Sequence, residues 1–265
     1  MKPQLMISSL LFTAALSLQA APAHAGVYVE EVHTMSAAGM PAQSRTVKTW
    51  IEGDMVRTDD PQSGGVILIN TRKNLIQGVH PSDKTWWQLK EQDMAMFGMA
   101  TVQAYGVKMG PDGKVQVPQN IFQKTGNRKK IGEWDAYEVK VNIEGGQAKG
   151  FSSTLWFANV PGYDPVHQRN RVKMWMGNGP EADAFMKQWD ALEGVPVLTE
   201  MKVTLQGQTL EVRQELKKVA PQKVRPQDLQ IPKGFKQVED PFTQLKRQMP
   251  QQGMPGGATP PPLAP

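Results

Sequence analysis

The chain has 265 residues, 30 basic and 25 acidic side chains, a formal net charge of +5, four histidines and no cysteine. This positive charge is too small and too scattered for a nucleic-acid-binding protein. The absence of cysteine excludes disulfide bonds, thiol catalysis and lipid attachment through a cysteine, so the fold must rest on its own core. The length suits one large domain.

Residues 1–25 have the pattern of a cleavable secretory signal peptide. Lys2 gives a positive start, an apolar run extends from Leu5 to Leu18, and Ala-His-Ala at 23–25 places small residues where signal peptidase reads them. We therefore expect cleavage before Gly26 and a periplasmic mature protein with 29 basic and 25 acidic side chains, a net charge of +4. The run is too short to span ~30 Å of hydrocarbon comfortably, and no later segment approaches a membrane-spanning length.

Short runs of alternating apolar and polar residues dominate the mature chain. They predict strands at 27–35, 45–52, 55–58, 66–69, 75–79, 85–89, 133–143, 151–158, 197–205 and 210–216. Turn residues such as Gly53-Asp54 separate most of these runs at close spacing. This spacing favours antiparallel neighbours in a meander over parallel strands joined by helices.

Two segments have helical spacing instead. In 91–105 the residues Met94, Phe97, Thr101 and Ala104 recur on one side, although Gly98 weakens the pattern. The segment 181–193 is the clearer prediction, because Pro180 marks its start and Gly194 its end. Its apolar stripe consists of Ala182, Phe185, Met186, Trp189 and Leu192, and the plain interpretation of that stripe is packing against a sheet.

Two further segments are polar. Residues 124–130, KTGNRKK, predict a basic loop whose Lys124, Arg128, Lys129 and Lys130 are candidates for contact with anionic headgroups, although such a run is more often a solvated turn. Residues 232–235 predict a turn that presses Phe235 back toward the body. From 241 to 265 the chain is rich in proline, glycine and glutamine, which predicts a disordered tail.

The sequence offers no catalytic signature. The mature histidines, His33, His80 and His167, are not spaced as metal ligands, and there is no Gly-x-Ser-x-Gly motif and no phosphate-binding loop. We therefore expect no enzymatic activity, no resident metal and no cofactor. A less favoured alternative is Cu(I) binding, because soft thioethers select that ion. The methionines concerned are Met94, Met96, Met99, Met174 and Met176.

Several motifs together carry a resemblance to a known group of proteins. They are TVKTWIEGDMVRTDD, WDAYEVKV, TLWFA, PVLTEMKVTLQGQTLEVRQELKKV and DLQIPKGFKQV. Their order resembles a family of bacterial envelope proteins related to the outer-membrane lipoprotein carriers and receptors, the LolA/LolB-like superfamily. The resemblance implies a mainly β (α+β) fold for residues 26–240. We expect a curved antiparallel sheet that forms an incomplete barrel, covered by two or three helices.

The resemblance also implies a ligand cavity on the concave side of that sheet. Its candidate lining residues are Trp50, Trp87, Met94, Phe97, Trp156, Phe157, Phe185, Met186, Trp189 and Met201. As strand neighbours, Trp156 and Phe157 cannot both face inward. The carriers use an arginine to link sheet and helices, a position for which Arg45 and Arg57 are candidates.

The expected function is non-enzymatic binding of a lipid, a lipoprotein acyl chain or another apolar envelope ligand by a monomer, with transient contact to an anionic membrane surface and no nucleic-acid partner. The alternative class is a structural or envelope-stress interaction module whose core is already filled.

Overall fold

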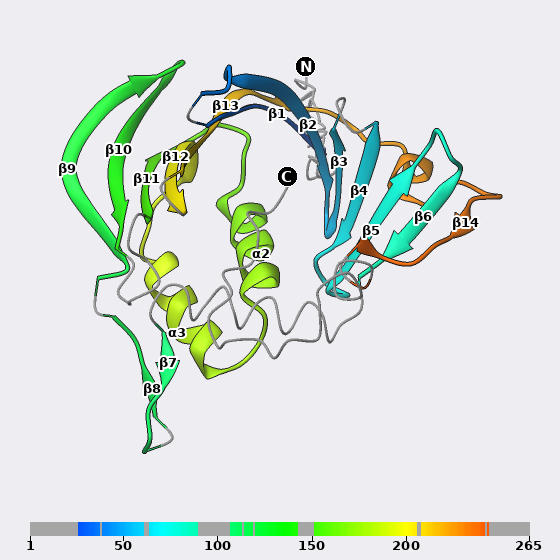
Figure 1. The fold of residues 1–265 in the computed structure, drawn as a ribbon. Coiled ribbons are helices and arrows are strands. Elements are labelled where there is room, and N and C mark those ends of the chain that lie inside the picture. The colour runs from blue at the N-terminus through cyan, green and yellow to red at the C-terminus, as the bar shows by residue number, and fades with distance from the viewer. Residues whose placement is uncertain are drawn as a thin grey trace, which may run out of the picture.

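The computed structural model describes residues 26–37, 39–60, 64–89, 107–112, 114–118, 120–142, 151–205, 208–241 and 243. Within these ranges a 12-stranded sheet curves into an arch that does not close, and two α-helices lie on its concave side (Figure 1). This arrangement confirms the mainly β fold class and the incomplete barrel with covering helices.

The first half of the sheet contains strands β1 (Val27–Ala37), β2 (Gln43–Glu52), β3 (Met55–Asp60), β4 (Gly65–Asn70), β5 (Leu75–His80) and β6 (Thr85–Gln88). The second half contains β9 (Phe122–Ile131), β10 (Trp134–Val141), β11 (Phe151–Ala158), β12 (Val195–Leu205) and β13 (Gln208–Pro221). A short hairpin of β7 (Lys108–Met109) and β8 (Val115–Gln116) stands apart from the arch.

The sheet is a meander whose two halves meet at β1 and β13. The strand order is β14-β6-β5-β4-β3-β2-β1-β13-β12-β11-β10-β9, and every pairing is antiparallel except that of β14 (Lys236–Gln237) with β6. Pairing of the first strand with the last long strand brings the N-terminal and C-terminal halves together. Bulges interrupt the register of β1 with β13 and of β11 with β12, which increases the local bend of the sheet.

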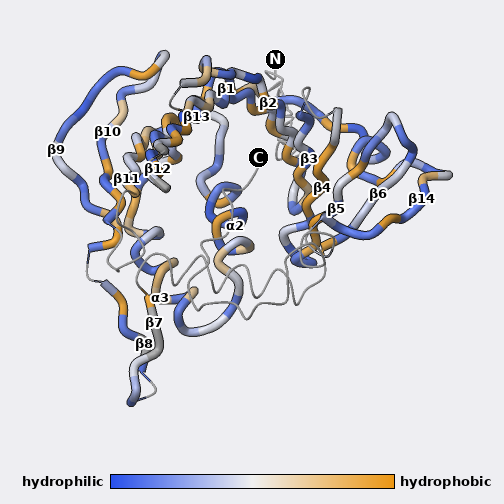
Figure 2. The backbone as a smooth tube through the Cα atoms, in the orientation of Figure 1, coloured by the Kyte–Doolittle hydropathy of each residue, from blue (hydrophilic) through white to orange (hydrophobic). Residues whose placement is uncertain are grey.

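The predicted strands are confirmed, several of them with longer bounds, whereas β9 and the short strands β7, β8 and β14 were not predicted. The final strand continues to Pro221 rather than ending near 216. The prediction of a loop at 124–130 is wrong, because these residues lie within β9. Gly126 and Asn127 indicated a turn, but Gly126 has a φ of +86° at an irregularity in the pairing with β10, and the strand continues through it. Figure 2 shows β9 as largely hydrophilic, unlike β4. A strand at the border of a sheet tolerates this composition because it is paired on one side only.

The two helices differ in how their sequences reveal them. Helix α3 (Pro180–Trp189) confirms the second predicted helix but ends earlier than 193. Helix α2 (Pro165–Met176) was not predicted, because its polar residues surround it without forming an apolar stripe. Its boundaries are nevertheless marked: the side chain of Asp164 accepts a hydrogen bond from the backbone of Val166, Pro165 starts the helix, and Gly177 ends it at a φ of +78°.

The C-terminal segment packs on the outer face of the arch. A 3-10 helix, η1 (Pro226–Leu229), follows β13, and the turn at 232–235 places Phe235 against the outer apolar cluster, as predicted. That cluster contains Val66, Leu68 and Val79, with Trp86 and Ile231. The predicted signal peptide, the helix at 91–105 and nearly all of the predicted tail lie outside the described residues.

One glycine is required by close packing on β5. Gly78 pairs with Trp87 of β6, and a Cβ added to Gly78 would overlap the indole ring of Trp87. Because Gly78 has no side chain, the indole of Trp87 can pack directly against the backbone of β5 on the concave side of the sheet.

We predict that Gly78→Ala destabilises the protein by about 1–3 kcal/mol, because the indole must leave its packed position. Urea unfolding of the variant measures this loss. In a Trp87→Leu background the same glycine substitution should cost much less, since the ring that it meets is gone. An equal cost in both backgrounds would contradict the role assigned to this contact.

Candidate functional site

The inner face of the first half of the sheet is a continuous apolar surface. Antiparallel partners face the same side, so the register aligns Val27, Ile51, Val56, Ile69 and Ile76 across strands β1 to β5. All five are at most 8 % exposed. They belong to one cluster with Met174 of α2, and Trp175 packs against that cluster. This apolar surface, Val27–Ile51–Val56–Ile69–Ile76, is here called the inner strip.

The second half of the concave side is filled by helix α3. Phe185 and Met186 are 1 % and 3 % exposed and pack with Phe157 of β11 in a second cluster. The ring centroid of Trp189 lies 5.6 Å from that of Phe157 and 5.5 Å from that of Phe122, both edge-on. Aromatic pairs in this geometry add to the stabilisation from burial.

Polar contacts fix α3 in addition. The side chain of Gln188 donates to the carbonyl of Pro118 (2.7 Å) and accepts from the backbone N–H of Ile121 (3.0 Å). The helix is therefore part of the core of the second half. The predicted lid residues Phe185, Met186 and Trp189 lie together, but within tight packing.

Helix α2 is held differently. Of its side chains only Met174 and Met176 are buried, and they belong to different clusters. The positive charge of Arg171 acts on the hydroxyl of Tyr163, which precedes the helix, and on the carboxylate of Glu31 in β1. Glu31 in turn lies 3.4 Å from His33, measured between Oε2 and Nε2. The charge of Arg171 thus couples this helix electrostatically to β1, one of the two strands at which the halves of the arch meet.

The electrostatics of Glu31 follow from this contact. Its side chain is 24 % exposed, and burial opposes its ionisation. The hydrogen bond from His33 and the charges of Arg171 and His33 outweigh burial, and together they lower the pKa of the Glu31 carboxyl from its ordinary value of 4.5. Burial raises the pKa of Tyr163, so its hydroxyl stays protonated. Nδ1 of His33 is buried without a hydrogen-bond partner among the described residues.

A small polar pocket opens beside α2. It has a volume of about 360 Å³, and Met174 is its apolar member. The rest of its lining is Asp54, Thr71, Arg72, Asn74, Asn170, Lys173 and Asn178. Because Met174 also belongs to the inner cluster, this pocket reaches the side chain that covers the apolar surface.

The other predicted cavity residues are divided between the two faces. Trp87 packs on the inner cluster, with Nε1 donating to Nε2 of His80 at 3.2 Å. Met201 is half-buried, and its register with Ser153 puts it on the same face as Leu155 of the α3 cluster. Trp50 is the strand neighbour of Ile51 and faces outward, where it lines a separate pocket with Tyr28. Met94 and Phe97 lie outside the described residues.

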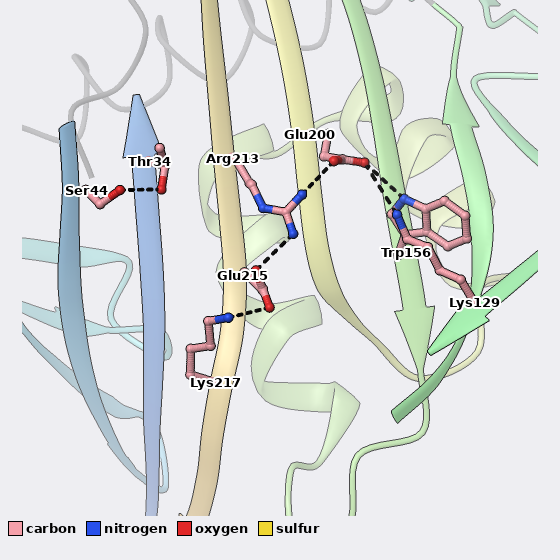
Figure 3. A network of polar contacts seen from close by, with 8 residues as sticks. All are labelled: Thr34, Ser44, Lys129, Trp156, Glu200, Arg213, Glu215 and Lys217. Carbon is pink, nitrogen blue, oxygen red and sulfur yellow. Dashed lines mark hydrogen bonds and ion pairs between the residues drawn. The ribbon is translucent and has the colours of Figure 1, made fainter. Parts of the chain in front are cut away.

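Trp156 lies on the outer face, whereas Phe157 lies inside. Figure 3 shows the indole beside a chain of polar side chains that crosses the sheet. Its Nε1 donates to Glu200 at 3.2 Å, and Nζ of Lys129 lies 3.8 Å from its ring centroid. Arg213 then links Glu200 to Glu215. The network ties the indole to polar side chains of β9 and β12, and the indole itself is 7 % exposed, in the cluster that also contains the inner strip.

The four predicted headgroup cations are separated by the strand that carries them. Lys129 lies over Trp156 on the outer face, whereas Nζ of Lys124 lies 5.3 Å from the ring centroid of Tyr137, which stacks on the inward-facing Phe157. Arg128 and Lys130 flank Lys129 and therefore point away from it. These cations lie along one edge of the sheet rather than on one patch.

Neither predicted linking arginine reaches a helix of the concave side in the described structure. Arg45 pairs with Asp60 at 3.1 Å, and Arg57 binds both carboxylate oxygens of Asp59 and the carbonyl of Asp228. Arg171 makes the contact instead, and the capping signals around α2 were the sequence signal that could have found it. In the described part of the chain no three His, Asp or Glu side chains come together as metal ligands, and no helix is long and apolar enough to cross a membrane.

Comparison with known proteins gives likenesses of fold. The sequence matches no protein-family model and no curated protein sequence. Two structures of PNGF-II match over 84 % of this chain at 13 % identity, with TM-scores of 0.40 and 0.39, and the chain spans about a third of their length (32 % and 33 %).

Two smaller structures match over 78 % of this chain and 90 % of their own. They are a LolA superfamily protein from Nitrosomonas europaea (11 % identity, TM-score 0.31) and an outer membrane lipoprotein-sorting protein domain from Vibrio parahaemolyticus (10 % identity, TM-score 0.30).

We predict that Arg171→Met destabilises the protein by about 1–3 kcal/mol, because it removes the positive charge that favours the partly buried Glu31 carboxylate. Glu31→Gln in the same background should recover part of that loss, since an amide needs no cation. Urea unfolding of the two single variants and the double variant gives the coupling between the two sites. Additive losses would contradict a direct interaction.

The same contact predicts a pH dependence. A carboxyl whose pKa is lowered on folding stabilises the protein above its ordinary pKa, and this stabilisation is lost as pH falls through the folded value. Between about pH 5 and pH 3 the unfolding free energy of Glu31→Gln should therefore decline less steeply than that of the unchanged protein. Glu211→Gln, at an exposed carboxylate of β13, is the control for the substitution itself. Identical slopes for Glu31→Gln and the unchanged protein would count against the assignment.

Proposed function

We propose that this protein is a non-enzymatic periplasmic binding protein for a lipid, a lipoprotein acyl chain or another chain-like apolar ligand. The observation that supports this most is the packing at the inner strip: five aligned apolar side chains share a cluster with Met174 of α2, a helix that buries only two residues of its own. Because α2 buries so little apolar surface of its own, an apolar ligand can displace it from the inner strip.

The free energy of burying a long apolar ligand favours replacement of α2 on the inner strip by that ligand. Each methylene of a ligand that is buried on the inner strip contributes about 0.8 kcal/mol. Displacing α2 costs the packing of Met174 and Trp175 and the contact of Arg171 with Glu31, which amounts to several buried methylenes. A long acyl chain exceeds this cost, whereas a short one does not. The flexible thioether of Met174 can repack against chains of different shape.

The two helices then have different roles. Helix α3 stays in place, because its aromatic contacts and the hydrogen bonds of Gln188 belong to the core. Helix α2 moves, and the polar pocket beside Met174 marks the side on which a ligand begins to enter. Trp87, Met201, Met94 and Phe97 remain proposed members of the binding surface.

Contact with the membrane is part of the same proposal. Lys124, Arg128, Lys129 and Lys130 lie along the β9 edge, so an anionic surface would meet the edge of the sheet rather than either face. The mature protein, residues 26–240 with a tail from 241, acts as a monomer after removal of residues 1–25.

A second candidate has its own support. The α3 half of the concave side is filled by Phe157, Phe185 and Trp189, which is the packing of a domain whose core needs no ligand. If the concave side of the first half is also filled by the protein's own side chains, the protein is an interaction module of the envelope. Ligand-binding measurements separate the two candidates.

We predict that the mature chain, purified without detergent, carries lipid in native mass spectrometry and binds the fluorescent fatty acid 11-(dansylamino)undecanoic acid. Val56→Ala, in the inner strip, should weaken probe binding by up to about tenfold, since two methyl groups are lost from the contact surface. Val139→Ala is the matched control beneath α3, with similar burial and a similar expected loss of stability. A clean apo mass together with no saturable probe binding would support the filled module instead.

A further inference from the structure

A second pocket lies on the convex side of the sheet, away from the proposed acyl-chain surface. It has a volume of about 710 Å³ and lies over β2 and β3, beside the end of β13. Its lining includes Trp50, Tyr28, Lys48, Arg57, Asp59 and Lys218. Strand alternation separates it from the inner strip, because Trp50 and Ile51 face opposite sides of β2.

An aromatic platform forms one wall of this pocket. The rings of Trp50 and Tyr28 lie 5.3 Å apart and are tilted by 52°, and the guanidinium carbon of Arg57 is 6.0 Å from the Trp50 ring centroid. The hydroxyl of Tyr28 donates to Glu30 at 2.6 Å, which holds that ring in place. Trp50 is only half-buried, so this pocket presents a fixed, flat apolar surface to solvent.

The charges around the platform are unequal. The Asp59 carboxylate is bound by Nε and Nη2 of Arg57 at 2.7 and 3.0 Å, and Asp60 pairs with Arg45 at 3.1 Å. Lys48 and Lys218 form no ion pair with any residue that the structure describes. The acids that line the pocket are thus paired with arginines. Lys48 and Lys218 are the cross-strand neighbours of Glu30 on either side, and Nζ of Lys218 lies 6.0 Å from the Tyr28 ring centroid, so the two ammonium groups flank the aromatic side chains.

We infer that this pocket binds a saccharide whose pyranose ring carries an anionic substituent. One face of a pyranose is a flat array of C–H groups, which packs on an indole, and its hydroxyls can pair with the Arg57–Asp59 fork. Lys48 and Lys218 supply the charge that an acidic sugar requires. An inorganic anion would not use the indole, and an acyl chain would leave these charges unpaired.

The expected export of the chain favours a sugar over the other ring-shaped anion, a nucleotide. The signal-peptide pattern of residues 1–25 directs the protein outside the cytoplasm, where acidic saccharides are constituents of the envelope. The inference is independent of the acyl-chain proposal, since the two surfaces lie on opposite sides of the sheet.

The test titrates the mature protein with trigalacturonic acid and with its methyl ester, which has the same rings without the charges, and follows both by isothermal calorimetry and ligand-observed NMR. The acid should bind measurably below about 10 mM and more tightly than the ester. Lys48→Met with Lys218→Met should weaken binding of the acid about tenfold and leave the ester unchanged. Trp50→Ala should weaken both about tenfold, with Trp50→Phe retaining part of the binding.

Lys140→Met, an exposed lysine elsewhere on β10, is the matched control and should change neither titration. The lysine variants alter exposed side chains, so they report on binding even if Trp50→Ala fails to fold. No saturable binding of the acid, or binding that ignores both Trp50 and the two lysines, overturns the inference. Tighter binding of uridine monophosphate through the same residues overturns the ligand class.

Discussion

The curvature of the sheet is the constraint on which the rest of the structure depends. A bent sheet that does not close into a barrel leaves a concave apolar face, and that face must be removed from water. Here β1 pairs with β13. This pairing joins the N-terminal strands β1 to β6 and the C-terminal strands β9 to β13 into one arch. The two halves then solve the same problem in different ways, one with α3 and the other with α2.

The difference between the helices is one of chemistry. Helix α3 has an apolar stripe that matches the aromatic side chains of β9 and β11, so the helix and the strands form one core. Helix α2 is polar on most sides and is joined to β1 through Arg171 and Glu31. Apolar packing does not depend on protonation, whereas the electrostatic effect of Arg171 on Glu31 requires that the carboxyl be ionised. The packing of α3 on the sheet is therefore independent of pH, whereas the attachment of α2 depends on the ionisation of Glu31.

The sequence predicted the strands well because alternating apolar and polar residues are typical of a strand with one buried and one exposed face. It failed at α2, where only the capping residues Asp164, Pro165 and Gly177 mark a helix. It also failed at β9, because charged residues and Gly126 are typical of loops and only pairing with β10 makes them a strand. Both elements owe their structure to tertiary contacts, which local patterns do not contain.

The candidate site shows the same limit. Phe157, Phe185, Met186 and Trp189 were predicted as one group, and the structure places them together because helix and strand periodicity fix their faces. Trp50 was assigned inward, yet it lines a pocket on the side of β2 opposite to Ile51. Of the neighbours Trp156 and Phe157 only one was expected to face inward, and Phe157 is the one that packs under α3. Assignment of a face depends on the register with neighbouring strands, and a shift of one residue reverses it. The link through Arg171 joins residues far apart in the sequence, so no local pattern could indicate it.

The borders of the sheet have a consequence for the behaviour of the protein in concentrated solution. The unpaired N–H and C=O groups of an edge strand can hydrogen-bond to a strand of another molecule, and repetition of this pairing leads to aggregation. In this fold the β6 border is occupied by the two-residue strand β14 of the same chain, and the β9 border carries a dense row of positive charge. One end is too short to template a neighbour, and the other repels a second copy of itself, so the open arch resists fibrous self-association.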